Sequence, residues 1–308
     1  MQTNNESDEM VRATNQGDEM MQANIVILAG GVSSRMKKAL ANAADLDPSL
    51  LKDAQQKSKS MIGVGRDSRP FLDYLLDTIS QAAYQNVVIV VGERDNSIRE
   101  YYERGESAGR FPGLKISYAI QSIPAGREKP LGTADALLQA LKSMPAWKGQ
   151  RLTVCNSDNL YSVRALKLIR SDTHENAMID YDRSALQFEQ ERIEKFAVIQ
   201  KDAQGFLVDI IEKPTPEQIA RASDARGRIG VSMNLFRFSY DMIHSSVERV
   251  PLNQVRQEKE LPAAVMLMIG RHPRSMFTIP LSEHVPDLTS PADILRVRTD
   301  LERGGMTE

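Results

Sequence analysis

Short apolar runs recur along the first half of the chain, and each ends at glycine or at polar residues. Ile25–Ala29 stops at the pair Gly30-Gly31, and Val87–Val91 is equally apolar. Uninterrupted runs of this length indicate strands that are buried on both faces of a parallel sheet. Further strands are predicted over Lys115–Gln121 and Arg151–Cys155.

Segments with helical periodicity lie between these runs. Arg69–Ala83 places apolar residues three and four positions apart, which is typical of an amphipathic helix. Helices are also expected over Asn96–Glu103, over Ala134–Lys142 with Thr133 as the cap, and over Val163–Ile169. This alternation predicts an α/β fold, Rossmann-like and doubly wound, with a mostly parallel mixed sheet flanked by helices.

The pattern changes in the second half of the chain. Lys195–Gln200 and Phe206–Ile211 flank a turn and predict a β-hairpin. A strand is expected at Gly230–Phe238. Three more helices are expected, near Tyr240–Val247, Glu260–Met268 and Pro291–Leu301. We therefore expect one catalytic domain over residues 24–303, with a small hairpin extension on the substrate side over about residues 176–250.

Composition narrows the class of protein. The 39 basic and 41 acidic residues give a formal charge of −2, without the basic surplus typical of nucleic-acid binders. A single cysteine, Cys155, rules out an intrachain disulfide framework and a cysteine-rich zinc site. No apolar run approaches the roughly 18 residues needed to span a bilayer. Residues 1–23 are polar, so we expect a disordered or weakly helical leader and a cytoplasmic protein.

The first candidate site follows the first predicted strand, at Leu28–Lys37. The glycines Gly30 and Gly31 let the backbone approach a phosphate or a base, and their N–H groups can cradle an anion. Arg35 adds a forked cation suited to phosphate oxygens. The spacing fits neither a dinucleotide fingerprint nor a P-loop. An ordinary strand-to-helix turn with a surface arginine is the alternative.

The second candidate site is Asn156-Ser157-Asp158-Asn159, directly after the strand that ends at Cys155. Ligands of doubly wound sheets bind beyond the carboxyl ends of the strands. A carboxylate at this place, beside phosphate-binding loops, can hold Mg²⁺, which takes few carboxylates together with phosphate oxygens. The alternative is that Asp158 simply caps the next helix.

Two further clusters could serve a substrate. Gly132-Thr133 puts a position without Cβ at a helix N-terminus, where a base or ribose could lie; it could also be a plain helix start. Glu212-Lys213-Pro214 ends a predicted strand, and strand alternation would send Glu212 and Lys213 to opposite faces. A solvated, charged strand end is the alternative for this cluster.

Taken together, these motifs resemble those of the sugar-1-phosphate nucleotidyltransferases (nucleoside diphosphate sugar pyrophosphorylases). The resemblance covers residues 24 to about 303, with the motifs in the family's order. Leu28–Arg35 is similar to the signature Leu-x-Gly-Gly-x-Gly-Thr-Arg, and Ser58-Lys59 to the Pro-Lys that follows it. The chain departs from the family by Ser33 in place of a glycine, by an insertion over residues 38–56, and by the absence of a tryptophan before Asp287.

The resemblance assigns roles to individual residues. It implies nucleotide binding by Leu28, Ala29, Gly30, Gly31, Gln121, Gly132 and Thr133, sugar-phosphate binding by Glu212, Lys213 and Asn234, catalytic roles for Arg35, Lys59 and Lys213, and Mg²⁺ ligation by Asp158 and Asp287. Residues 176–250 would form the sugar-phosphate side. In the insertion we expect two short helices parted at Asp47-Pro48, which could act as a lid.

The implied reaction transfers a nucleoside monophosphate from an NTP to a sugar 1-phosphate by in-line displacement of pyrophosphate. The partners would be the NTP and the sugar phosphate, with neither nucleic acid nor membrane, and a homo-oligomeric state stays open. One alternative is nucleotidyl transfer to another phosphate, such as phosphocholine. Another is a non-catalytic, sugar-nucleotide-sensing homologue, disfavoured because Arg35, Lys59 and Asp158 are present. The last is a glycosyltransferase, disfavoured because the match to its usual Asp-x-Asp reads Asn156-Ser157-Asp158 here. The motifs decide neither the base nor the sugar.

Overall fold

The computed structural model describes residues 23–31, 58–64, 68–104 and 109–302. Three sequence expectations lie outside these residues: the leader (except its last residue, Ala23), the phosphate-loop residues Ser33 to Arg35, and the helical insertion at 38–56.

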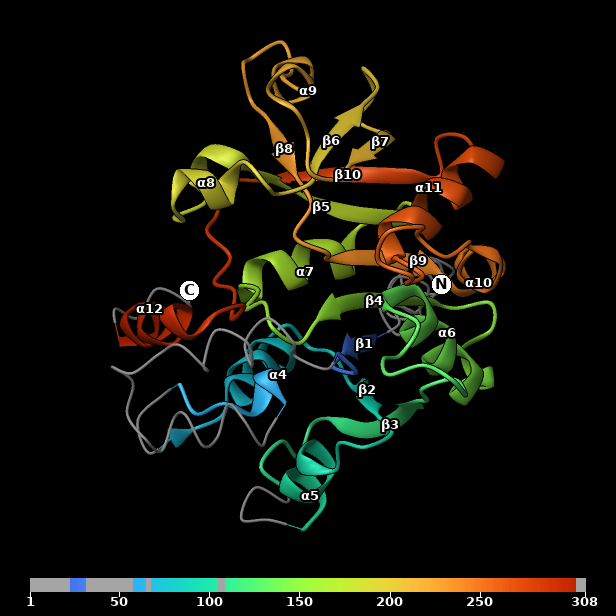
Figure 1. Cartoon of the computed structure of the whole chain (residues 1–308), viewed down its shortest axis with the longest axis vertical. Coiled ribbons are helices and arrows are strands. Elements are labelled where there is room, and N and C mark those ends of the chain that lie inside the picture. The colour runs from blue at the N-terminus through green and yellow to red at the C-terminus, as the bar shows by residue number, and fades with distance from the viewer. Residues whose placement is uncertain (1–22, 32–57, 65–67, 105–108, 303–308) are drawn as a thin grey trace, which may run out of the picture.

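A single ten-stranded sheet runs through the described part of the chain (Figure 1). Its first four strands are parallel, in the order β3-β2-β1-β4. Their bounds are β1 Asn24–Leu28, β2 Asn86–Gly92, β3 Lys115–Gln121 and β4 Arg151–Asn156. Strand β1 therefore lies between β2 and β4, and the winding order reverses there. This is the topology of an open doubly wound sheet.

Beyond β4 the sheet becomes mixed. Strand β9 is antiparallel to β4 and to β5, and β10 pairs in parallel with β5. The bounds are β5 Asn176–Asp182, β6 Val198–Lys201, β7 Leu207–Ile211, β8 Gly230–Val231, β9 Phe236–Ser239 and β10 Met276–Leu281. The predicted hairpin is β6 and β7, which pair antiparallel. The fold class predicted from the sequence is confirmed.

Helices cover both faces of the sheet, because side chains of a buried strand alternate between two apolar cores. Ile25 and Ile27 belong to one core, and Val26 and Leu28 to the other. The first core includes residues of α4 (Phe71–Gln81), α5 (Ser97–Arg104), α7 (Val163–Ser171) and α12 (Pro291–Glu302). The second includes residues of α6 (Thr133–Ser143), α10 (Tyr240–Arg249) and α11 (Leu261–Arg271).

Several short helices complete the described chain. They are η1 (Lys59–Met61), η3 (Pro145–Trp147), η4 (Arg183–Ala185), α8 (Gln190–Ile193) and α9 (Pro216–Arg221). No helix in the described ranges is long and apolar enough to cross a membrane.

Two differences from the sequence expectation concern the site. The single strand expected at Gly230–Phe238 is two strands, because Asn234, between β8 and β9, has a left-handed backbone with φ 56°. Thr133 is the first residue of α6 and not its cap; that position belongs to Gly132, whose φ of 101° favours glycine. Both exceptions lie beside the cleft described next.

Candidate active site

A cleft of about 620 Å³ opens where the carboxyl ends of β1 and β4 meet. The loops after these strands are joined by a backbone hydrogen bond, in which Ser157 N donates to the carbonyl of Leu28 at 3.2 Å. Since β1 is the strand at which the winding reverses, this is the place where doubly wound sheets bind their ligands.

Residues from distant stretches of the sequence line this one cleft. The predicted site residues among them are Leu28, Ala29, Gly30, Gly31, Lys59, Gln121, Gly132, Thr133, Asp158, Glu212, Lys213 and Asn234. Arg35 lies outside the described residues. Asp287 lines a second, smaller cavity of about 180 Å³.

One wall of the cleft is built from the end of β3 and the start of α6. The Gln121 side-chain nitrogen Nε2 donates to the carbonyl of Gly132 and to Asp135 Oδ2, each at 2.8 Å. Thr133 Oγ1 accepts a hydrogen bond from Leu261 N at 2.9 Å, which ties α6 to α11. A Cβ at Gly132 would stand 2.8 Å from the carbonyl oxygen of Lys259, so this turn has room only for glycine.

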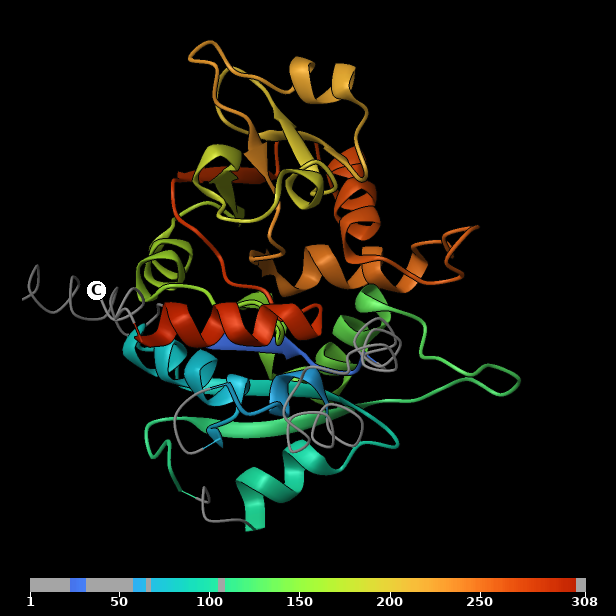
Figure 2. The same cartoon turned by 60° about the vertical axis from the view of Figure 1, so that its left-hand side comes forward.

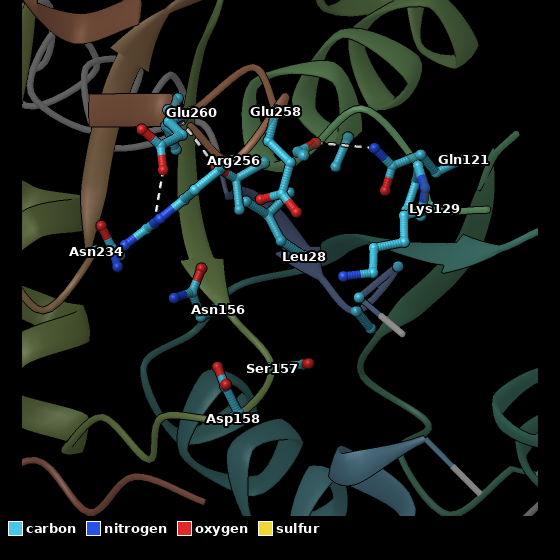
Figure 3. Close-up of a pocket in the computed structure, with 18 of the residues that line it drawn as sticks. Leu28, Gln121, Lys129, Asn156, Ser157, Asp158, Asn234, Arg256, Glu258 and Glu260 are labelled. Carbon is cyan, nitrogen blue, oxygen red and sulfur yellow. Dashed lines mark hydrogen bonds and ion pairs between the residues drawn. The ribbon is translucent and has the colours of Figure 1, made fainter. Parts of the chain in front are cut away.

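At the floor, Lys59 and Asp158 form an ion pair. Lys59 Nζ lies 2.5 Å from Asp158 Oδ2, and both side chains are about one-fifth exposed, at 18% and 22%. Ser162, and not Asp158, caps helix α7 by accepting from Ala165 N at 3.0 Å. The reading of Asp158 as a helix cap is therefore wrong, and its carboxylate faces the cleft (Figure 3).

The backbone next to Asp287 contacts the loop of Asp158, but the carboxylate of Asp287 is engaged by other residues. Leu288 N donates to the carbonyl of Asp158 at 2.8 Å. The carboxylate of Asp287 accepts from Thr289 Oγ1 at 2.7 Å and pairs with Arg192 at 2.8 Å. Burial raises the pKa of Asp287 and the nearby charge of Asp158 raises it further, whereas Arg192 opposes both.

The residue types at the floor fit a divalent cation through Asp158 alone. Its second carboxylate oxygen is not used by Lys59, and Mg²⁺ is satisfied by one or two carboxylates with water and phosphate oxygens. Both oxygens of Asp287 are already engaged. Within the described ranges no group of three or more His, Cys, Asp or Glu residues is arranged to hold a metal ion.

The opposite wall carries Glu212 and Lys213, directly after β7. Both line the cleft, so the expectation that they point to opposite faces is wrong. Strand geometry ends at Ile211, and Lys213 has a left-handed backbone with φ 48°, which breaks the alternation. Desolvation raises the pKa of Glu212, and the negative charge of Glu260 raises it further. The positive charges of Arg256 and Lys213 lower it in part.

With this geometry in place, comparison with known proteins identifies the chain. A family model described as Nucleotidyl transferase matches residues 54–279, which is more than half of the sequence. The chain belongs to the nucleotidyl transferase family. The matched segment includes Lys59, Gln121, Asp158 and Lys213.

Curated relatives are distant. Glucose-1-phosphate adenylyltransferase 1 of Vibrio parahaemolyticus is 23% identical over 200 residues, covering 65% of this chain and 45% of the relative. D-glycero-alpha-D-manno-heptose 1-phosphate guanylyltransferase of Campylobacter jejuni is 24% identical over 197 residues, covering 63% and 70%. The chain spans about half the length of the first curated relatives that it matches.

Solved structures support the fold. A UDP-glucose pyrophosphorylase complexed with UDP-glucose matches with a TM-score of 0.66 and 16% identity, over 91% of this chain and 98% of that one. A putative glucose-1-phosphate thymidylyltransferase from Bacillus anthracis matches with a TM-score of 0.61 and 16% identity, over 90% and 94%. At such identity the likeness establishes the architecture and not the substrate.

The nucleotidyl transferase cleft also contains residues that the sequence motifs did not indicate. Lys129 comes from the β3–α6 connection, and Arg256, Glu258 and Glu260 come from the α10–α11 connection. Arg256 pairs with Glu260 at 2.6 Å (Figure 3). In the part of the chain that the structure describes, Lys129 forms no ion pair. For the three residues of the α10–α11 connection, the high density of charged residues over 256–260 is the signal that could have found them.

Proposed function

We propose that this protein transfers a nucleoside monophosphate from an NTP to a sugar 1-phosphate and releases pyrophosphate. One observation carries the proposal: the glycine turn Gly30-Gly31, the Lys59–Asp158 pair, the Gln121–Gly132 wall and Lys213 line a single cleft at the switch point of the sheet. The names of the curated relatives and of the structural neighbours support the same substrate class.

The reaction needs two anions to be held close together in line. Transfer at an α-phosphorus depends on positioning and charge neutralisation more than on a protein nucleophile. Gly30, Gly31 and Lys59 would hold the triphosphate, together with Arg35 of the glycine-rich signature. Lys213 and Arg256, which also line the cleft, would neutralise the sugar phosphate. The attacking phosphate is already ionised at neutral pH, so a general base is not required.

Mg²⁺ belongs to this proposal, with Asp158 as the ligand that the structure supports best. When bound, Mg²⁺ supplies charge neutralisation at the transferring phosphate. Lys59 now contacts Asp158 Oδ2, and it could turn towards the triphosphate once another cation shares that carboxylate. Asp287 would serve as a second ligand only after its contact with Arg192 is loosened. A cytoplasmic location also stays part of the proposal, because NTPs are the substrates.

A matrix of substrates tests the function directly. Pyrophosphate release is measured for each of ATP, CTP, GTP, UTP and dTTP against a panel of sugar 1-phosphates, with phosphocholine as a non-sugar acceptor. We expect release that depends on both an NTP and a sugar 1-phosphate. Release with phosphocholine alone would favour the other nucleotidyl transfer, and NTP binding without release in any combination would contradict the proposal.

A further inference from the structure

A buried tyrosine hydroxyl lies behind the loop that carries Asp158. Tyr161 is 0% exposed and packs in the first apolar core, three positions after the aspartate. Its side chain returns to the start of this loop, where Tyr161 Oη accepts a hydrogen bond from Asn156 N at 3.4 Å. A hydroxyl in an apolar core is costly unless it is hydrogen-bonded, so its partners show what it holds in place.

The same hydroxyl also reaches the turn between β8 and β9. Tyr161 Oη donates to the carbonyl of Met233 at 2.8 Å, and the carbonyl of Asn234 lies 3.4 Å away. A tyrosine hydroxyl has one hydrogen to donate and can accept as well. The short bond to Met233 uses the hydrogen, and the longer bond from Asn156 N uses a lone pair. One oxygen atom therefore links the Asp158 loop (residues 156–159) to the Asn234 turn (residues 232–235).

Both linked segments supply residues to the cleft. Asn156, Asp158 and Asn234 line it, and Figure 3 shows them in succession along one side. Asn234 has a left-handed backbone with φ 56°, a conformation that persists in residues other than glycine only where the surroundings enforce it. The bond to the carbonyl of Met233, the preceding residue, is one such constraint. Tyr161 thus holds the shape of the turn and its distance from the Asp158 loop.

We propose that Tyr161 is a positioning residue that fixes the spacing between the nucleotide and the sugar phosphate by linking the Asp158 loop to the Asn234 turn. This rests on the proposed function, because it assumes that Asp158 serves the nucleotide and that the Asn234 turn serves the sugar phosphate. In-line transfer is sensitive to such spacing, since a misplacement of about 1 Å can lower the rate by about 10²-fold. A ligand that touches one segment should not sense the spacing, whereas a ligand that spans both should.

Two tyrosine variants separate this role from a general loss of stability. Tyr161→Phe removes the linking oxygen and keeps the ring in the core. Tyr84→Phe is the matched control, because Tyr84 is 2% exposed in the same core and its hydroxyl bonds with Thr153 Oγ1 at 2.7 Å. Tyr84 precedes β2, at the amino ends of the parallel strands, whereas the cleft lies at their carboxyl ends. Both variants lose a buried hydrogen bond, so both should unfold at a lower Tm than wild type.

Ligand binding and turnover should distinguish the two variants. Calorimetry uses the NTP and the sugar 1-phosphate that release most pyrophosphate in wild type, each alone, and their product NDP-sugar, which spans both segments. In Tyr161→Phe we expect Kd values within about twofold of wild type for the two single substrates, a Kd for the NDP-sugar raised about tenfold, and kcat lowered about tenfold or more. In Tyr84→Phe all of these values should be those of wild type. An NDP-sugar Kd that changes no more than the NTP Kd overturns the positioning role.

Hydrogen exchange on the ligand-free proteins tests the link without any substrate. Amides of residues 156–159 and 232–235 should exchange faster in Tyr161→Phe than in wild type or in Tyr84→Phe, because local opening becomes easier once the linking bond is lost. Equal protection of these amides in the two variants also overturns the positioning role. If the two segments loosen as expected but wild type releases pyrophosphate with no pair of substrates, the link stands and only the proposed function fails.

Discussion

Lys59 and Asp158 neutralise each other across the floor of the cleft, although 99 positions separate them in the chain. Both side chains are partly exposed, so a ligand can reach each of them. The sequence could name both residues: Asp158 directly follows a predicted strand, and the resemblance to the family indicated Lys59. It could not show that they touch, since their contact depends on the pairing of β1 with β4.

Asp158→Asn should leave the fold intact and lower turnover by about 10²-fold or more, because the neutral amide is a poor Mg²⁺ ligand. The fold should survive because Ser162 caps helix α7. Turnover is measured by pyrophosphate release, and folding by circular dichroism. Asp209→Asn, at a carboxylate of β7, serves as the control and should behave as wild type. Near-normal turnover of the Asp158 variant with Mg²⁺ would show that the metal assignment is wrong.

Lys213→Ala should weaken use of the sugar phosphate while NTP binding survives. Lys213 lines the cleft directly after β7, which lies at the other end of the strand order from β3, the strand that ends at Gln121. Removing its charge leaves the acceptor phosphate to repel the triphosphate. Steady-state kinetics should show a raised KM for the sugar phosphate, and calorimetry an unchanged Kd for the NTP. Lys142→Ala, at an exposed lysine of α6, is the control. A variant that lost NTP affinity and kept its KM for the sugar phosphate would contradict this role.

At the scale of elements, the sequence predicted β1, β2 and β4 from their apolar runs and missed β5 and β10. Strand β5 contains Asp180, a fully buried residue whose charge is met by Lys201 and Arg228, each at 2.6 Å. Lys201 and Arg228 lie outside β5, so the polar residues of β5 argue against a strand when its sequence is read alone. Strand β10 was also missed, because it contains Pro280 and a proline argues against a strand when the sequence is read alone.

Gly132→Ala tests the junction between α6 and the α10–α11 connection. The substitution forces a Cβ against the backbone at Lys259 and puts alanine at φ 101°, a region that costs about 1–3 kcal/mol for residues other than glycine. We expect a loss of that size in the free energy of unfolding, measured with urea, and a raised Kd for the NTP.

Gly126→Ala is the matched control for this junction. Gly126 lies in the same β3–α6 connection and also has a positive φ, of 79°, but a Cβ there meets no described atom within 4 Å. It should suffer the strain of a left-handed backbone, about 1–2 kcal/mol, without a change in NTP binding. Equal effects of the two variants on NTP binding would mean that the contact with Lys259 is unimportant.

At the scale of the whole molecule, the site is wider than the motifs suggest, because two connections meet over it. The β3–α6 and α10–α11 connections project from the same side of the molecule in Figure 2. They are joined by a hydrogen bond from Lys259 N to the carbonyl of Leu131, at 2.5 Å, and by one from Arg127 to the carbonyl of Gln257. No local pattern encodes that meeting. Arg256 therefore escaped prediction, whereas the resemblance to the family did indicate Gln121.

The C-terminal segment also returns to the centre of the sheet, where it is fastened by Arg192. This residue of α8 pairs with Asp287 Oδ2 at 2.8 Å and with Asp293 Oδ1 at 2.5 Å. Asp293, in the first turn of α12, is 2% exposed. Its other oxygen accepts from Ser290 N at 2.6 Å. One guanidinium thus offsets two carboxylates, and one of these would be needed by a metal ion shared with Asp158.

Arg192→Met should make stability depend more strongly on a divalent cation. Without the guanidinium, Asp287 and Asp293 lie close together uncompensated, which should lower the free energy of unfolding by up to about 3 kcal/mol in EDTA. A cation bound at Asp287 and Asp158 would restore part of that loss, because any ligand of the folded state stabilises it by mass action. The rise in Tm on replacing EDTA with Mg²⁺ should therefore be larger in the variant than in wild type. Arg296→Met removes an exposed pair with Glu189 at the same cavity and should show the wild-type rise. If the Arg192 variant gained no more from Mg²⁺ than this control, Asp287 would not be a metal ligand and Arg192 would only fasten the C-terminal segment.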